Sequence, residues 1–181
     1  MTDVREILLT ELRGQRRRVI ATLSGLPDET LVRSRLPSGW SPLGMVRHLT
    51  YDVEHFWFQC VVADVAIDLP TDDEVWHPDV WPDARAVVEA YEAAGARSDA
   101  VIESTPLDAL PSDQARATYP GAPNRNLMAT MVHVITETAT HAGHLDIDRE
   151  LIDGHQHLVL TEFTTQSARR TQRRPGNVTR D

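Results

Sequence analysis

Residues 133–148 read His133-Val-Ile-Thr-Glu137-Thr-Ala-Thr-His141-Ala-Gly-His144-Leu-Asp-Ile-Asp148. The three imidazoles and two of the carboxylates recur at steps of four, four, three and four residues. At the ~100° per residue of an α-helix, these five side chains fall within an arc of about 80°. Such a stripe is either the polar outer face of a helix or one wall of a metal site.

An apolar stripe lies directly beside the polar one on the same predicted helix. Polar side chains that border an apolar seam are close enough to the axis of a helical bundle to point inward. Asn126 is the expected N-cap, and Asp153-Gly154 is the expected end. The apolar positions are Leu127, Met131, Val134, Thr138 and Leu145.

Three further segments are predicted to be long helices. Pro-rich stretches separate them, and four prolines between residues 106 and 123 are expected to keep that region out of helix. Segment 157–163 has the residue types of a strand, but one strand makes no sheet. Four helices therefore predict an all-α, four-helix bundle. The three helices are expected at about 3–23 with Thr2 as N-cap, at 42–65 with Ser41 as N-cap and Pro42 at the first position, and at 83–103.

The composition is that of one globular domain. The chain has 181 residues, 41% of them hydrophobic and 25% charged. It has no apolar run near the ~20 residues that span a bilayer, and no signal-peptide core. Its sole cysteine, Cys60, is expected to be buried and structural, which fits a reducing compartment. We therefore expect a cytoplasmic protein with no membrane partner.

The charge is divided unevenly along the chain. The net charge is -9, while residues 161–181 carry five arginines against Glu162 and Asp181, or +3, which leaves -12 for residues 1–160. Phosphate contacts need clustered cations, so the acidic body argues against a nucleic-acid partner. The Arg-rich end, residues 159–181, is expected to be a flexible tail.

The second predicted helix offers a partner for the polar stripe. His48 stands among apolar residues, and Asp52 and His55 follow at i+4 and i+7, which on an α-helix is the same face. His48, Glu137 and His141 together would supply three ligands and leave an open position, as catalytic zinc sites do. Zinc suits this set of ligands, and nickel or iron are alternatives. A hydrogen-bonded core histidine and a solvated helix face explain the same residues without a metal.

The sequence resembles the DinB/YfiT-like superfamily, and within it the mini-circle (DUF664) branch. The resemblance rests on Gly39-Trp-Ser-Pro-Leu-Gly-Met-Val-Arg-His48-Leu, on Glu137-Thr-Ala-Thr-His141-Ala-Gly-His144-Leu-Asp and on Arg149-Glu-Leu-Ile-Asp-Gly154. It spans about residues 1–158 and implies a four-helix-bundle domain, often dimeric, whose metal ligands here are His48, Glu137 and His141. The Glu137 version is similar to the metal site of mycothiol-dependent maleylpyruvate isomerase.

The sequence departs from the family pattern at two positions. His144 occupies a position where many relatives carry Gln, and Thr140 replaces a frequent Arg or His. His144, Asp52, His55 and Arg47 are therefore expected around the metal or against a substrate rather than as ligands. His133 and Asp148 are assigned to the rim or the surface. The four tryptophans, residues 40, 57, 76 and 81, are expected either to line a pocket at the mouth of the bundle or to anchor the core and loops.

The resemblance implies chemistry with a low-molecular-weight thiol such as mycothiol. A metal-bound thiol is deprotonated and attacks a small electrophile, in S-transfer or in isomerisation. Two alternatives stay open. One is metal-dependent hydrolysis of a small ester or amide with Glu54, Asp52 or His144 as the base, and the other is a non-enzymatic bundle that binds a metal or ligand.

Overall fold

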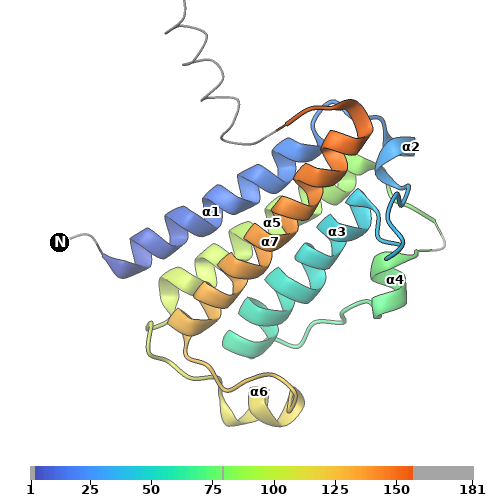
Figure 1. Cartoon of the computed structure of the whole chain (residues 1–181). Coiled ribbons are helices and arrows are strands. Elements are labelled where there is room, and N and C mark those ends of the chain that lie inside the picture. Colours follow the sequence, from blue (N-terminus) through green and yellow to red (C-terminus); the bar gives the residue numbers. More distant parts are fainter. Residues whose placement is uncertain (1–2, 79, 157–181) are drawn as a thin grey trace, which may run out of the picture.

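The computed structural model describes residues 3–78 and 80–156, and all regular structure within these ranges is helical (Figure 1). The predicted all-α bundle is therefore confirmed. The segment 157–163 and the tail 159–181 lie outside the described residues. The elements are α1 (Val4–Leu23), α2 (Asp28–Leu31), α3 (Pro42–His48), the π-helix η1 (Leu49–Val62), α4 (Asp72–Trp76), α5 (Ala84–Ser104), α6 (Asp113–Thr118) and α7 (Leu127–Asp153).

The long helices begin at capping residues that the sequence displays. Ser41 accepts a hydrogen bond from the Gly44 amide, and Asn126 accepts one from the Ala129 amide, as predicted. Helix α7 ends at Gly154, whose φ of 74° is left-handed and favours glycine. The N-cap of α1 is Asp3 rather than the predicted Thr2, because the Asp3 carboxylate accepts from the Arg5 amide.

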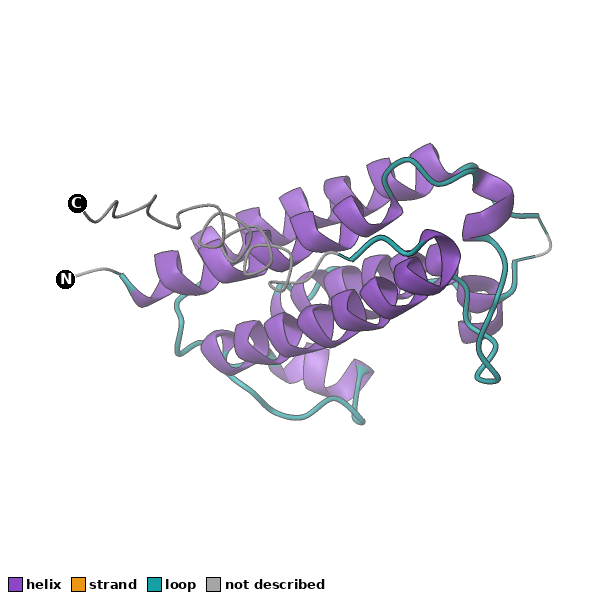
Figure 2. Ribbon diagram, turned by 45° about the horizontal axis from the view of Figure 1, so that its top comes forward, coloured by secondary structure: helices purple, strands orange, loops and turns teal. Residues whose placement is uncertain are grey.

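The bundle places sequence-distant helices side by side. Helix α1 packs along α7, and α5 packs along η1, while α7 also contacts both α3 and η1 (Figure 1). Figure 2 shows the same long helices turned, with the short helices at their ends. Because α7 lies against α3 and η1, the polar stripe of the last helix faces the helix that carries His48.

The second long helix is not a continuous α-helix. It is α-helical through His48 and π-helical from Leu49 to Val62, and just beyond it the Ala63 amide donates to the Phe58 carbonyl, 3.0 Å away. A π-helix bonds i→i+5, so each residue advances less around the axis than in an α-helix. Side chains seven residues apart, such as His48 and His55, therefore do not return to the same face.

Three short helices interrupt the connections. Helix α4 lies in the Pro- and Asp-rich loop. Helix α6 lies between residues 106 and 123, which the prolines were expected to keep out of helix, so the expectation for this region was wrong. Local caps explain both. Thr71 and Glu74 form a capping box at α4, and Ser112 accepts from the Ala115 amide at α6.

A largely buried ion-pair network joins three long helices of the bundle. Arg16 of α1 donates to both carboxylate oxygens of Glu54 in η1, at 2.6 and 2.8 Å, and to Asp99 of α5 at 2.6 Å. Glu54 is fully buried. Three long elements therefore meet at one guanidinium.

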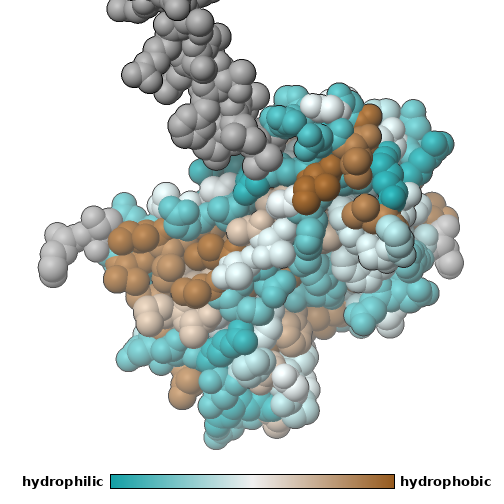
Figure 3. Space-filling model, viewed as in Figure 1, coloured by the Kyte–Doolittle hydropathy of each residue, from teal (hydrophilic) through white to brown (hydrophobic). Residues whose placement is uncertain are grey.

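Several large apolar side chains remain exposed on the bundle. Figure 3 shows apolar surface over the first turns of α1 and α7, where Val4, Ile7, Met128 and Val132 are exposed. Contiguous apolar surface of this kind is a feature of interaction sites. None of the helices in the described ranges has the length and apolar character needed to cross a membrane.

Candidate metal centre

His48, Glu137 and His141 come together between α3 and α7. One potential ligand atom from each lies within 4.8 Å of the other two. Ligand atoms about 2.1 Å from one zinc at tetrahedral angles are about 3.4 Å apart, so the side chains need only a small closure to meet one ion. Glu137 is the most exposed of the three, at 38%, and its carboxylate is free to make that movement.

His48 is held by partners on two sides. Its Nδ1 lies 2.8 Å from the Asp52 carboxylate, and its ring stacks on Trp76 with centroids 5.0 Å apart. A hydrogen bond at one ring nitrogen fixes the imidazole and leaves the other nitrogen available to a metal. Asp52 thus holds His48 with Nε2 free for the centre.

His141 is held in a similar way. Its Nδ1 lies 3.3 Å from Nδ1 of His144, while its Nε2 lies 3.4 Å from the Glu137 carboxylate. Its ring also meets the edge of His48, with centroids 5.0 Å apart. Burial lowers the pKa of His141, and the neighbouring His48 lowers it further. A low pKa favours the neutral imidazole, which is the form that binds metals.

The residues fit a divalent metal in their chemistry. Two imidazole nitrogens and one carboxylate oxygen form a set of ligands that zinc accepts, with room for a fourth, exchangeable ligand. Outer partners that orient ligating histidines are typical of metal sites, and both histidines have one here.

His133 lies at the far edge of the stripe. Its Nδ1 is 4.0 Å from the Glu137 carboxylate, and its ring meets Trp57 edge-on at 4.8 Å. Burial lowers its pKa, and so does the nearby Arg125, which lies over the Trp57 ring. The rim position predicted for His133 agrees with this geometry. Arg125 stands in a loop without periodicity, so no sequence pattern marks it.

Asp148 and Arg47 are both held by partners within the protein. Asp148 was expected at the rim or the surface, but it is buried and paired with Arg35 at 3.2 Å, and burial raises its pKa. Arg47 was a candidate for gripping a substrate, but it donates to the backbone carbonyls of Glu74 and Val75. The Arg47 guanidinium therefore ties α4 to α3.

His55 and Glu54 also lie away from the triad. The two ring nitrogens of His55 lie 2.8 Å from the Gln59 amide and 3.4 Å from the Arg97 guanidinium of α5. The predicted shared face of His48 and His55 was wrong, because η1 is not α-helical. Glu54 is engaged by Arg16 and is not available as the base that a hydrolase would need.

Comparisons with known proteins agree with this architecture. The sequence model of a family described as mycothiol S-transferase matches residues 7–154. A solved structure of a conserved protein from Enterococcus faecalis superposes with a TM-score of 0.62 at 14% identity, covering 86% of this chain and 100% of that one. At that identity the likeness concerns the fold alone. A comparison with curated proteins gave no match.

Proposed function

The chain belongs to the mycothiol S-transferase family, and we propose that it is a metal-dependent enzyme that transfers a mycothiol-like thiol to a small electrophile. The observation that supports the proposal is the convergence of His48, Glu137 and His141 from two helices about ninety residues apart in sequence. The family supports a mycothiol-like thiol as the co-substrate, and the triad supports a metal ion that activates this thiol.

The proposed roles of the site residues are as follows. His48, Glu137 and His141 hold a divalent ion, with zinc the metal best suited to the ligands. When bound, such an ion lowers the pKa of a coordinated thiol, so that the sulfur is a thiolate at neutral pH. Asp52 and His144 orient the two imidazoles through their Nδ1 atoms. Trp76 stacks on His48 and covers one face of that imidazole.

A conjugation assay tests the proposal. Zinc-loaded protein is mixed with mycothiol and monobromobimane, and the fluorescent thioether is followed against protein treated with a chelator. We expect metal-dependent conjugation that His141→Ala reduces by at least about a hundredfold, because losing a ligand removes the activated thiol.

The matched control is His133→Ala, which removes an imidazole from the same stripe without removing a triad member. We expect it to retain most of the conjugation rate. Turnover of ester substrates in the absence of any thiol would instead support the hydrolase, and equal rates with and without metal would contradict the proposal.

A further inference from the structure

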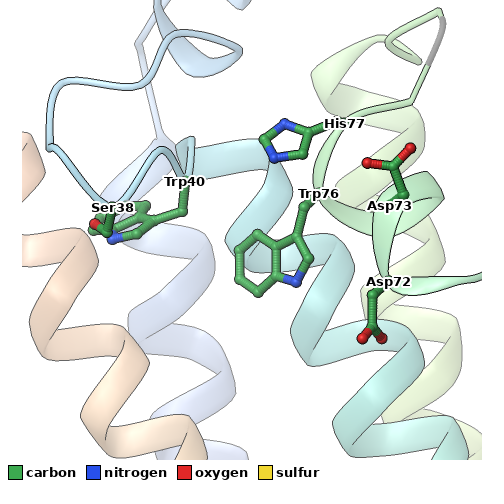
Figure 4. A pocket seen from close by; sticks show the side chains of 6 residues that line it. All are labelled: Ser38, Trp40, Asp72, Asp73, Trp76 and His77. Atoms are coloured by element: carbon green, nitrogen blue, oxygen red, sulfur yellow. The ribbon is translucent and has the colours of Figure 1, made fainter.

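A cavity of about 480 Å³ opens beside the triad, at the end of the bundle where α4 covers α3. That volume is in the range of small-molecule sites. Figure 4 shows the indoles of Trp40 and Trp76 on two sides of the opening, and His77 and Asp73 beside Trp76. The lining residues are Ser38, Trp40, Asp72, Asp73, Trp76 and His77.

The cavity adjoins the candidate metal centre through its aromatic walls. The Trp76 ring that lines the cavity also stacks on His48, 5.0 Å between centroids. The Trp40 ring lies 6.2 Å from His144. A ligand held between the two indoles would therefore have its end close to the triad.

The carboxylates at the cavity are those of Asp72 and Asp73, with Ser38 and His77 as further polar side chains. Asp72 and Asp73 are exposed, and among residues 3–78 and 80–156 no arginine forms an ion pair with either carboxylate. Arg47 reaches this helix, where its Nε donates to the Val75 carbonyl and one terminal nitrogen donates to the Glu74 carbonyl. A cleft with one sign of charge concentrates ligands of the opposite sign.

Indole faces and carboxylates together favour one class of ligand. The faces of tryptophan rings carry negative potential and attract organic cations, above all quaternary ammonium groups. Carboxylates at the same opening add to that attraction and repel anions. A hydrophobic neutral ligand would use the indoles but would gain nothing from Asp72 and Asp73.

We propose that this cavity binds the organic cation of a substrate, an alkylammonium group, and so selects cationic or neutral electrophiles over anionic ones. The assignment of this cation to the electrophile rests on the proposed function. The binding of the cation does not, because it needs neither the metal nor the thiol.

Calorimetric titration of the full chain with matched probes tests the proposal. Choline carries the cation, 3,3-dimethylbutan-1-ol is its neutral isostere, and 3,3-dimethylbutanoate carries a negative charge. We expect choline to bind at least about fivefold more tightly than the alcohol, because cation–π attraction and the carboxylates act only on the cation. The anion should bind more weakly than both.

Variants test whether the preference for choline over the alcohol comes from this cavity. Asp72→Asn with Asp73→Asn should bring choline binding to within about twofold of the alcohol, whose own binding should not change. Trp40→Leu should weaken both probes. Asp108→Asn makes a matched charge change at an exposed aspartate outside the cavity lining and should leave both affinities as in the wild type.

Three results would overturn the proposal: no choline binding, equal binding of choline and the alcohol, or tighter binding of the neutral polyol myo-inositol than of choline. The exposed Asp72 and Asp73 variants keep the test decisive even if Trp40→Leu fails to fold. Choline binding without any thiol conjugation would contradict the proposed function and leave the cavity assignment standing.

Discussion

His48 can serve a metal through the one ring nitrogen that Asp52 leaves free. The 2.8 Å contact between Nδ1 and the carboxylate fixes the tautomer, with the proton on Nδ1 and the lone pair on Nε2. An α-helical i,i+4 spacing in the sequence is enough to suggest this pair. The sequence could not show that Trp76 stacks on the other side of the ring, because α4 lies in a loop with no periodic pattern.

The first prediction concerns Asp52. We expect Asp52→Ala to weaken zinc binding by about 10–100-fold, because His48 loses the group that orients it. Asp52→Asn keeps an acceptor for the Nδ1 proton and should recover part of that loss. Competition with a chromophoric zinc chelator measures both, and an Asp52→Ala affinity equal to that of the wild type would contradict the assignment.

The second prediction concerns the pH dependence of stability. Burial, and then Arg97, lowers the pKa of His55 below its ordinary 6.5. At pH values above 6.5 His55 is neutral in both states, and its environment does not destabilise the fold. As the pH falls below 6.5, the unfolded chain binds a proton at His55 before the folded chain does, and this difference lowers the free energy of unfolding. The free energy of unfolding should fall between about pH 7 and pH 5, and less steeply in His55→Gln. Urea unfolding at several pH values measures this, and identical slopes in both proteins would refute it.

At the scale of elements, most helix starts could be predicted and the hydrogen-bond register of η1 could not. Caps such as Ser41 and Asn126 act locally, so the sequence displays them. From Leu49 the helix bonds i→i+5 where it packs against α5 and α7, and no residue pattern marks the change from i→i+4 bonding. The π-helical bonding of η1 is the reason why His55 does not share a face with His48, contrary to the sequence-based prediction.

The third prediction concerns the contact between α3 and α4. A Cβ at Gly44 would lie 3.3 Å from the Trp76 ring, so the indole packs directly on the glycine backbone. We expect Gly44→Leu to displace Trp76 from His48 while leaving the helical content unchanged. The tryptophan emission should shift to the red in Gly44→Leu, and combining it with Trp76→Phe should remove the shift. An unchanged emission maximum in the single variant would contradict this packing.

At the scale of the whole molecule, the residues suggested that the second and last long helices pair, and the family resemblance favoured that pairing over the alternatives. The periodicity of residues 133–148 leaves a polar face and a metal wall equally open, because contacts across about ninety residues leave no local signal. The structure brings His48, Glu137 and His141 together, and it places Asp148 in the interior, where it pairs with Arg35. The short helices and the tryptophan cavity likewise depend on tertiary contacts.

The fourth prediction concerns the ion pair that joins α1, η1 and α5. Glu54→Ala should lower the free energy of unfolding by about 3–5 kcal/mol, because Arg16 would keep a buried charge without its main partner. Replacing both residues together, as Arg16→Met with Glu54→Leu, should cost less than Glu54→Ala alone. Urea unfolding of the three proteins measures this, and a double variant less stable than Glu54→Ala would contradict it.

The metal content of purified protein tests the central claim most directly. Wild-type protein and four variants, His48→Ala, Glu137→Ala, His141→Ala and His133→Ala, are loaded with zinc, dialysed and analysed by mass spectrometry of the metal. We predict that the wild type and His133→Ala keep about one zinc per chain and that the three triad variants lose it, because each supplies one of three ligands. Zinc retained at the wild-type level in His48→Ala or His141→Ala would contradict the account, because the metal would then be held by other residues.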